Sequence, residues 1–284
     1  MFPHIVGPIH TYGVMLVIGF YSAWILALRR ARKEGVEGKH ISDMLVYTVI
    51  SGIAGARILY VITEWKYFES FWDIFKLWDG GLVFYGGLVT GAVTLIVLMK
   101  HRRLSIPKIA DILGPSIALG LALGRVGCLS YGCCWGVVAP ECPIAIRFPG
   151  RFVDDGGVIK PEGSPAFMQH VAEGRIDVPD KPGPSKSLPV VPTQPISSAD
   201  CLLICLITSF YFRFRKRYGE VFLLFGLLYS VHRFVIEIFR INPPVALGLT
   251  ISQLFSLVFG VFCLIMLVRS RLLASNIPVA GASG

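Results

Sequence analysis

The amino-acid sequence predicts an all-α polytopic membrane protein with seven transmembrane helices and a small extracytoplasmic head domain. The 284 residues are 54% hydrophobic with a mean hydropathy of +0.65, and several apolar runs have the length of about 20 residues that a membrane-crossing helix needs. The formal net charge of +9 is carried by short basic clusters between these runs. This distribution suits anionic headgroups, so the expected partner is membrane lipid and not nucleic acid.

Seven apolar segments are predicted to cross the membrane, and the fifth is short for a full crossing. They cover about residues 12–28, 43–63, 81–99, 109–127, 199–213, 220–239 and 250–268. The chain then divides into three parts. Residues 1–135 hold helices one to four, residues 136–198 form the head domain, and residues 199–284 hold helices five to seven and a cytoplasmic tail.

Basic residues fall in alternate loops, and this predicts the orientation of the chain. The clusters lie within Arg29–Lys39, Lys100–Lys108, Arg213–Arg217 and Arg269–Arg271. The opposite loop 64–80 carries only Lys66 and Lys76. Because cytoplasmic loops hold the excess of Lys and Arg, the N-terminus is predicted outside and the C-terminus in the cytoplasm.

The segment 136–198 is rich in proline and glycine and carries charges of both signs. It predicts short strands and loops, with an irregular second half from Pro179 to Pro195. In an oxidising compartment Cys142 is placed to form a disulfide with Cys133 or Cys134, although spacing does not decide this. The cysteines show no zinc-ribbon spacing, so no metal site is expected.

Charged residues lie inside the predicted spans, where they usually mark a functional site. Arg57, Arg125, Arg233 and Glu237 all fall there, and Arg125 belongs to the glycine-rich stretch Gly124–Gly136. Arg233 and Glu237 are four residues apart and therefore share a helix face. Three arginines with one acid leave an excess of positive charge, which favours a phosphate-binding cavity. The alternative is a structural network of ion pairs.

Several short motifs occur in a fixed order from residue 10 to residue 240, and together they resemble one family. They are His10–Gly13, Gly55–Ile58, Trp78–Gly81 with Gly86 and Gly87, Gly124–Gly127 with Gly132 and Trp135–Gly136, Pro192–Gln194 and Arg233–Arg240. The chain resembles the phosphatidylglycerol–prolipoprotein diacylglyceryl transferases of bacterial inner membranes. That family has seven helices and an external N-terminus, in agreement with the predicted spans.

The resemblance implies a reaction and its partners. The family moves a diacylglyceryl group from phosphatidylglycerol to the lipobox cysteine of a preprolipoprotein, and releases glycerol phosphate. It uses neither a metal nor a diffusible cofactor, and it works in the inner (cytoplasmic) membrane. By this resemblance Arg125 and Arg233 hold the lipid phosphate and are catalytic. The expected substrate-binding residues are Tyr12, Arg57, Gly81, Gly86, Gln194, Glu237 and Arg240.

Three positions depart from the family pattern. Tyr85 stands where the family usually has a histidine suited to thiol activation, and Cys128 and Cys133 replace an asparagine and a glutamate. Tyr85 is therefore the third catalytic candidate, although neutral tyrosine is a weak base and an interfacial aromatic anchor is an equally simple role. These replacements keep four further hypotheses open. They are a relative acting on a different anionic lipid or acceptor, a cysteine nucleophile in a different lipid transfer, a catalytically silent lipid- or lipopeptide-binding protein, and a transporter.

Overall fold

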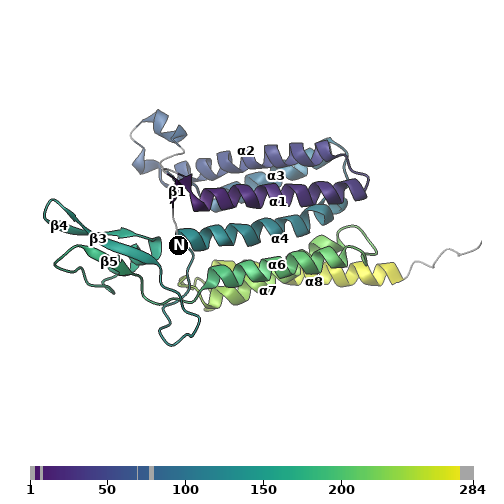
Figure 1. Ribbon diagram of the computed structural model, residues 1–284. Coiled ribbons are helices and arrows are strands. Elements are labelled where there is room, and N and C mark those ends of the chain that lie inside the picture. The colour runs from purple at the N-terminus through teal and green to yellow at the C-terminus, as the bar shows by residue number, and fades with distance from the viewer. Residues whose placement is uncertain (1–3, 7–8, 69, 77–79, 276–284) are drawn as a thin grey trace, which may run out of the picture. The chain divides into compact units, whose positions relative to one another are not determined.

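The structure is a computed structural model that describes residues 4–6, 9–68, 70–76 and 80–275 (Figure 1). The chain forms two compact units. The first comprises Met1–Ala23 and Gly114–Gly284, and the second comprises Trp24–Leu113. Helices α1, Thr11–Lys33, and α4, Ile106–Tyr131, contribute to both units. A hairpin of β1, His4–Val6, and β2, Ile9–His10, precedes α1.

Six helices in the described ranges are long and apolar enough to cross a membrane. They are α1, α2 (Gly38–Thr63), α4, α6 (Thr193–Tyr211), α7 (Glu220–Ile238) and α8 (Ile251–Ser275). The third predicted span corresponds to α3, Phe84–His101, whose apolar stretch is shorter. The prediction of a mostly helical, multi-pass membrane protein is confirmed in this form.

The fifth predicted span begins six residues too late. It was expected over residues 199–213, whereas α6 already begins at Thr193. Prolines at positions 192 and 195 suggested irregular chain, but they fall at the cap and in the first turn. The N–H groups of a first turn have no intrahelical partner, so a proline there removes no helical hydrogen bond.

In the second unit, α2 and α3 pack closely through glycines. A Cβ added to Gly86 would lie 2.4 Å from the carbonyl oxygen of Gly55. The hydroxyl of Thr90 donates a hydrogen bond of 2.9 Å to the Ser51 carbonyl of α2. Such small-residue contacts let membrane helices approach at backbone distance. Two 3₁₀ segments, Trp65–Tyr67 and Phe71–Phe75, connect this helix pair.

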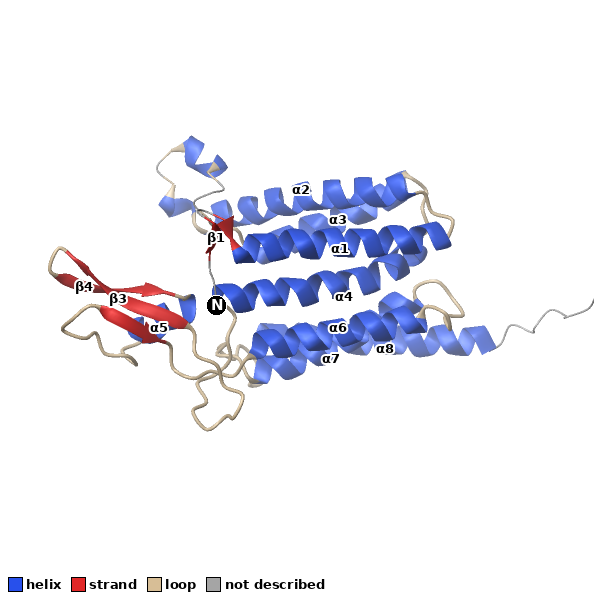
Figure 2. Cartoon of the chain, viewed as in Figure 1, coloured by secondary structure: helices blue, strands red, loops and turns tan. Residues whose placement is uncertain are grey.

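In the first unit, the start of α1 lies against the end of α4, and α7 packs on both α6 and α8 (Figure 2). A Cβ added to Gly127 of α4 would lie 3.2 Å from Cδ2 of Tyr12 and equally close to Met15. The glycine therefore lets Tyr12 lie directly against the last turns of α4.

A small sheet with one helix follows α4 in the same unit. Its strands are β3 (Pro149–Asp155), β4 (Val158–Gly163) and β5 (Gly183–Lys186), in the antiparallel order β4-β3-β5, and α5 covers Pro165–Ala172. Phe148, Ala166 and Val190 form its fully buried core. The predicted strands and loops are confirmed. The prediction of an irregular second half is wrong at β5 and at the start of α6, and α5 was not predicted.

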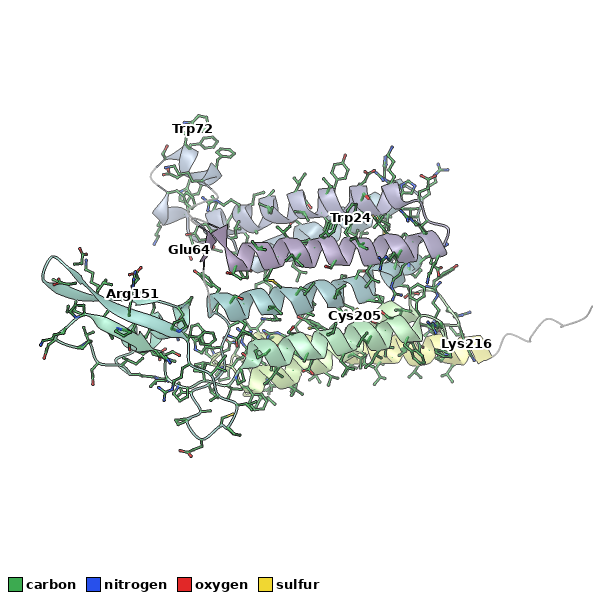
Figure 3. The ribbon with its side chains drawn as sticks, viewed as in Figure 1. Trp24, Glu64, Trp72, Arg151, Cys205 and Lys216 are labelled. Atoms are coloured by element: carbon green, nitrogen blue, oxygen red, sulfur yellow. The ribbon has the colours of Figure 1, made fainter. Side chains whose placement is uncertain are left out.

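The sheet and the basic loop between α6 and α7 lie at opposite ends of the first unit, as the labels of Arg151 and Lys216 show (Figure 3). Glu220 ties that loop to the end of α8. Its carboxylate accepts hydrogen bonds from the Lys216 amide at 3.1 Å and the Ser270 hydroxyl at 3.0 Å, and pairs with Arg271 at 3.3 Å. All seven cysteines are free, so the disulfide considered for Cys142 is not formed.

Candidate functional site

Arg125 lies near the end of α4, half-buried in the first unit. Its guanidinium has no hydrogen bond and no ion pair with any residue in the part of the chain that the structure describes. Its electrostatic neighbours include Tyr229 of α7, and its charge also acts on Tyr12 of α1. A guanidinium at the end of a membrane helix is costly unless an anion compensates its charge.

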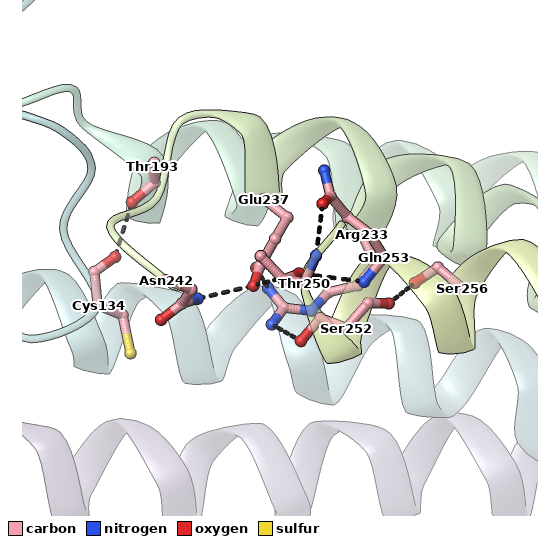
Figure 4. A network of polar contacts seen from close by, with 9 residues as sticks. All are labelled: Cys134, Thr193, Arg233, Glu237, Asn242, Thr250, Ser252, Gln253 and Ser256. Carbon is pink, nitrogen blue, oxygen red and sulfur yellow. Dashed lines mark hydrogen bonds and ion pairs between the residues drawn. The ribbon is translucent and has the colours of Figure 1, made fainter. Parts of the chain in front are cut away.

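Arg233 of α7, by contrast, has an acidic partner inside the protein (Figure 4). Its Nη1 lies 2.9 Å from Oε2 of Glu237, one turn further along the helix, and its Nη2 donates to the Ser252 hydroxyl at 2.8 Å. The other oxygen of Glu237 accepts hydrogen bonds from Asn242 at 2.7 Å and from Thr250 at 3.2 Å. The predicted pairing on one helix face is confirmed.

The residues that hold Glu237 come from the start of α8, and sequence reasoning missed them. Thr250 and Gln253 form a reciprocal capping box: the Thr250 amide donates to Oε1 of Gln253 at 3.0 Å, and the Gln253 amide donates to the Thr250 hydroxyl at 3.3 Å. The spacing Thr-x-x-Gln before an apolar run was the signal that could have predicted this cap. The cap positions the Thr250 hydroxyl toward the carboxylate.

Arg240 adds a second guanidinium without an acidic side-chain partner among the described residues. It acts electrostatically on Arg233 and on Cys134, as does Arg125. Asp200, the other acid close by, is hydrogen-bonded to His232 at 3.1 Å. Arg125 and Arg240 therefore both act on Arg233, whose acidic partner is Glu237, and the three guanidiniums with this one carboxylate retain a net positive charge.

The chain turns sharply after α4, and the start of α6 holds this turn. Gln194, which is fully buried, donates to the Cys133 carbonyl at 2.7 Å, and Thr193 donates to the Cys134 carbonyl at 2.7 Å. The predicted contribution of Gln194 to the wall of a lipid cavity stays a prediction. In the structure the Gln194 side chain donates a hydrogen bond to the backbone of this turn.

The turn brings three thiols together, those of Cys128, Cys133 and Cys134, with sulfur atoms within 4.8 Å of one another. Hydrogen bonds from the Cys128 and Cys133 thiols hold the pKa of Cys134 below its usual range, and Arg240 and Arg125 act in the same direction. The hydrogen bond with Cys128 raises the pKa of Cys133. Sequence reasoning considered one of these cysteines as a nucleophile, or all three as structural residues, and did not predict their convergence.

Arg57 lies in the second unit and is buried against the loop that joins α2 to α3. A guanidinium has five N–H donors, and all five are used by backbone carbonyls. Nε donates to Ile74 at 2.8 Å, Nη1 to Gly80 at 2.7 Å and Gly81 at 3.0 Å, and Nη2 to Asp73 at 2.7 Å and Lys76 at 3.1 Å. Arg57 therefore organises this loop, and its predicted contact with lipid would need some of these bonds to be exchanged.

The remaining predicted residues also belong to the second unit. Tyr85 begins α3 with 55% of its surface exposed. Gly81 has a φ of 75°, and a Cβ there would lie 2.3 Å from the Tyr60 ring, so a glycine is required on structural grounds alone. Gly86 is required by the α2–α3 contact. Their roles toward substrate stay predictions, and Trp78 and Asp79 lie outside the described residues.

Together the fold and the site residues define a multi-pass membrane protein with a guanidinium-rich cluster near the end of α4. A sequence profile described as prolipoprotein diacylglyceryl transferase matches residues 2–269. The chain belongs to the prolipoprotein diacylglyceryl transferase family.

Individual curated relatives agree over most of the chain. A protein named phosphatidylglycerol–prolipoprotein diacylglyceryl transferase 2 from Clostridium perfringens is 29% identical over 252 residues, which are 88% of this chain and 86% of the relative. The phosphatidylglycerol–prolipoprotein diacylglyceryl transferase of Thermotoga maritima is 31% identical over 87% of this chain and 76% of its own. The phosphatidylglycerol–prolipoprotein diacylglyceryl transferase of Erwinia tasmaniensis is 30% identical over 94% of this chain and 91% of the relative.

Proposed function

We propose that the protein transfers a diacylglyceryl group from phosphatidylglycerol to the lipobox cysteine of a prolipoprotein. The names of the curated relatives contain both substrates, phosphatidylglycerol and prolipoprotein. The observation that carries the proposal is Arg125, a guanidinium inside a membrane helix without a polar partner among the described residues. A lipid phosphodiester offers anionic oxygens that match a guanidinium in charge and in planar geometry.

In the proposed reaction the sulfur of the acceptor cysteine attacks the glyceryl carbon that carries the phosphate oxygen. A carbon–sulfur bond forms, the carbon–oxygen bond breaks, and glycerol phosphate leaves with the electron pair. Arg125 compensates the charge that develops on the leaving phosphate, with Arg233 beside it. Glu237 keeps Arg233 in one orientation through their contact at 2.9 Å.

The acceptor thiol releases its proton to water as the carbon–sulfur bond forms, and we assign hydrogen-bond assistance in this step to the Tyr85 hydroxyl, at the position where the resemblance implies a histidine. Tyr12, which lies beside Arg125 and against α4, is assigned to the lipid-binding surface. Arg240 enlarges the positive field that attracts the headgroup. Neither a metal nor a cofactor takes part in this scheme.

The proposal includes an orientation in the membrane. We assign α3 as a seventh crossing, with the N-terminus outside and the C-terminus in the cytoplasm of a bacterial inner-membrane protein. The basic loops support this orientation. The site near the end of α4 and the small sheet then belong to the extracytoplasmic side, where prolipoprotein emerges. Reporter fusions after Arg271 and near Gly163 test it, with cytoplasmic and external signals expected.

A transfer assay tests the function. Purified protein is mixed with phosphatidylglycerol vesicles and a lipobox peptide, and peptide mass reports diacylglyceryl addition. We expect transfer by the wild type, a loss of at least about a hundred-fold in Arg125→Ala, and poor rescue by Arg125→Lys, which lacks the planar fork. Arg151→Ala is the matched control, because this exposed arginine pairs with Glu162 on the sheet.

The outcomes separate two functions. Undiminished transfer by Arg125→Ala would contradict the role of the unpaired guanidinium. The second candidate is a catalytically silent lipid-binding relative, which the replacement of the family's histidine by Tyr85 favours. Wild-type protein that binds the vesicles but leaves the peptide unmodified would support this second candidate.

A further inference from the structure

The three thiols at the end of α4 form a cluster that the proposed transfer does not use. The sulfur atoms of Cys128, Cys133 and Cys134 all lie within 4.8 Å of one another. Within the described residues, the group has no other cysteine and no histidine, aspartate or glutamate. It is therefore an all-sulfur, three-membered set of donors.

The backbone builds this cluster. Gly132 ends α4 with a φ of 79°, and the Cys133 amide then donates back to the Cys128 carbonyl at 3.2 Å. Cys134 has a φ of 60°, which is unusual for a residue with a side chain. A strained conformation of this kind persists only where the surroundings hold it, and Thr193 and Gln194 bind the carbonyls of this turn. The sulfur atoms are thus positioned in advance.

We propose that Cys128, Cys133 and Cys134 form a three-coordinate site for a soft, thiophilic metal ion, and that copper(I) is the ion that fits it best. Thiolates select soft ions such as copper(I), whereas structural zinc almost always takes four ligands. Each thiol releases its proton to solvent as its sulfur binds the ion, and no oxidation or reduction takes place.

The distances agree with such a site. Metal–sulfur bonds of about 2.3 Å in a trigonal plane place the sulfur atoms about 4 Å apart. The observed limit of 4.8 Å is slightly larger, so small side-chain rotations are sufficient to close the site. Cys133 and Cys134 contribute from the turn after α4 and Cys128 contributes from the last turn of α4, so the donors approach the ion from two directions.

The surrounding charges also agree. Three thiolates with one copper(I) carry a net charge of −2. Arg240 and Arg125 both act on Cys134, and neither has an acidic side-chain partner in the described ranges. Their two positive charges compensate the loaded site. Because Arg125 would then serve both copper and phosphate, bound copper should oppose lipid binding, but copper binding itself does not depend on the proposed transfer.

Copper(I) titration of the full-length, reduced protein under anaerobic conditions in detergent tests the proposal. A chromogenic copper(I) chelator competes for the ion, and X-ray absorption reports the ligands. We expect one equivalent to bind with three sulfur ligands, and each of Cys128→Ser, Cys133→Ser and Cys134→Ser to weaken binding by at least about a hundred-fold. Cys142→Ser, which removes a free cysteine outside the cluster, should bind like the wild type.

A second measurement uses only the wild-type protein, so it does not depend on whether the cysteine variants fold. Alkylation of the wild-type protein, mapped by mass spectrometry, should show that copper protects Cys128, Cys133 and Cys134 and leaves Cys142 reactive. Absence of copper binding by the reduced wild type, equal binding by the cluster variants, or protection of Cys142 alone would overturn the proposal. Preferred binding of zinc(II) with a fourth ligand would overturn the assignment of a three-coordinate copper site.

Discussion

Arg57 and Arg125 are both arginines inside membrane helices, yet their surroundings differ completely. All five donors of Arg57 are used by carbonyl groups of its own unit, and none of the donors of Arg125 has a partner in the described part of the chain. The first guanidinium is part of the fold. The second has the unsatisfied donors and the charge that an anionic ligand requires.

This difference shows that charge at membrane depth does not by itself identify a ligand site. Sequence reasoning counted Arg57, Arg125 and Arg233 together as excess positive charge. The contacts separate them into one arginine held by carbonyls, one paired with Glu237 at 2.9 Å, and one without a partner among the described residues. The hydrogen-bond and ion-pair partners of each arginine therefore indicate its role better than the number of charges in the membrane does.

Arg57→Ala should have the largest effect on stability. Removing this side chain leaves the five carbonyl groups that accept its hydrogen bonds without their donor, and we expect the free energy of unfolding to fall by about 3–5 kcal/mol. Denaturant titration in mixed micelles measures this change. Arg57→Lys has a single ammonium in place of the planar guanidinium, so it should recover only part of the lost unfolding free energy. Unfolding like that of the wild type would mean that the loop does not depend on Arg57.

Glu237→Gln should convert a paired arginine into an unpaired one. The amide keeps the shape but removes the charge that compensates Arg233, so we expect a loss of about 2 kcal/mol in unfolding free energy. Affinity for phosphatidylglycerol, measured on vesicles, should be retained or increased because the site gains positive charge. If lipid affinity fell as steeply as stability, Glu237 would have to contact the lipid itself.

Tyr85→Phe tests the third catalytic candidate, for which the family resemblance implies a histidine position. The phenylalanine keeps the ring and removes the hydroxyl, and we expect turnover to fall about ten-fold, below the usual contribution of acid–base assistance. Tyr85→His should retain or raise activity toward a lipobox peptide. Equal rates for the wild type and Tyr85→Phe would leave this residue with the role of an interfacial anchor.

His170 gives the smallest predicted effect, and it concerns a buried group that stays neutral. Burial lowers its pKa, and its Nδ1 accepts a hydrogen bond from the Leu188 amide at 3.2 Å. A base with a lowered pKa in the folded state adds stability above its unfolded pKa of about 6.5, and this stability is lost as the pH falls below that value. The protection factors for hydrogen exchange in residues 165–190, which correct for the intrinsic pH dependence of the exchange rate, should therefore fall between pH 7 and pH 5. His170→Gln should weaken this dependence.

The sequence was sufficient to predict the helices, the basic loops and the strands of the head, because each depends on local composition and periodicity. It also predicted the Arg233–Glu237 pair, which lies within one helix. The partners of Arg57 could not be predicted in this way, because they are backbone carbonyls of a loop whose path depends on tertiary contacts. The thiol cluster likewise arises from a turn that Thr193 and Gln194 hold from a distant part of the sequence.

The most direct test of the account compares Arg125→Ala with Arg57→Ala in two measurements on the same preparations: phosphatidylglycerol affinity and unfolding free energy. We predict that Arg125→Ala loses lipid affinity by at least about thirty-fold, or 2 kcal/mol, while its stability equals or exceeds that of the wild type. Arg125→Ala protein that binds phosphatidylglycerol like the wild type, but unfolds more readily, would show that Arg125 is a structural residue and would contradict the central claim.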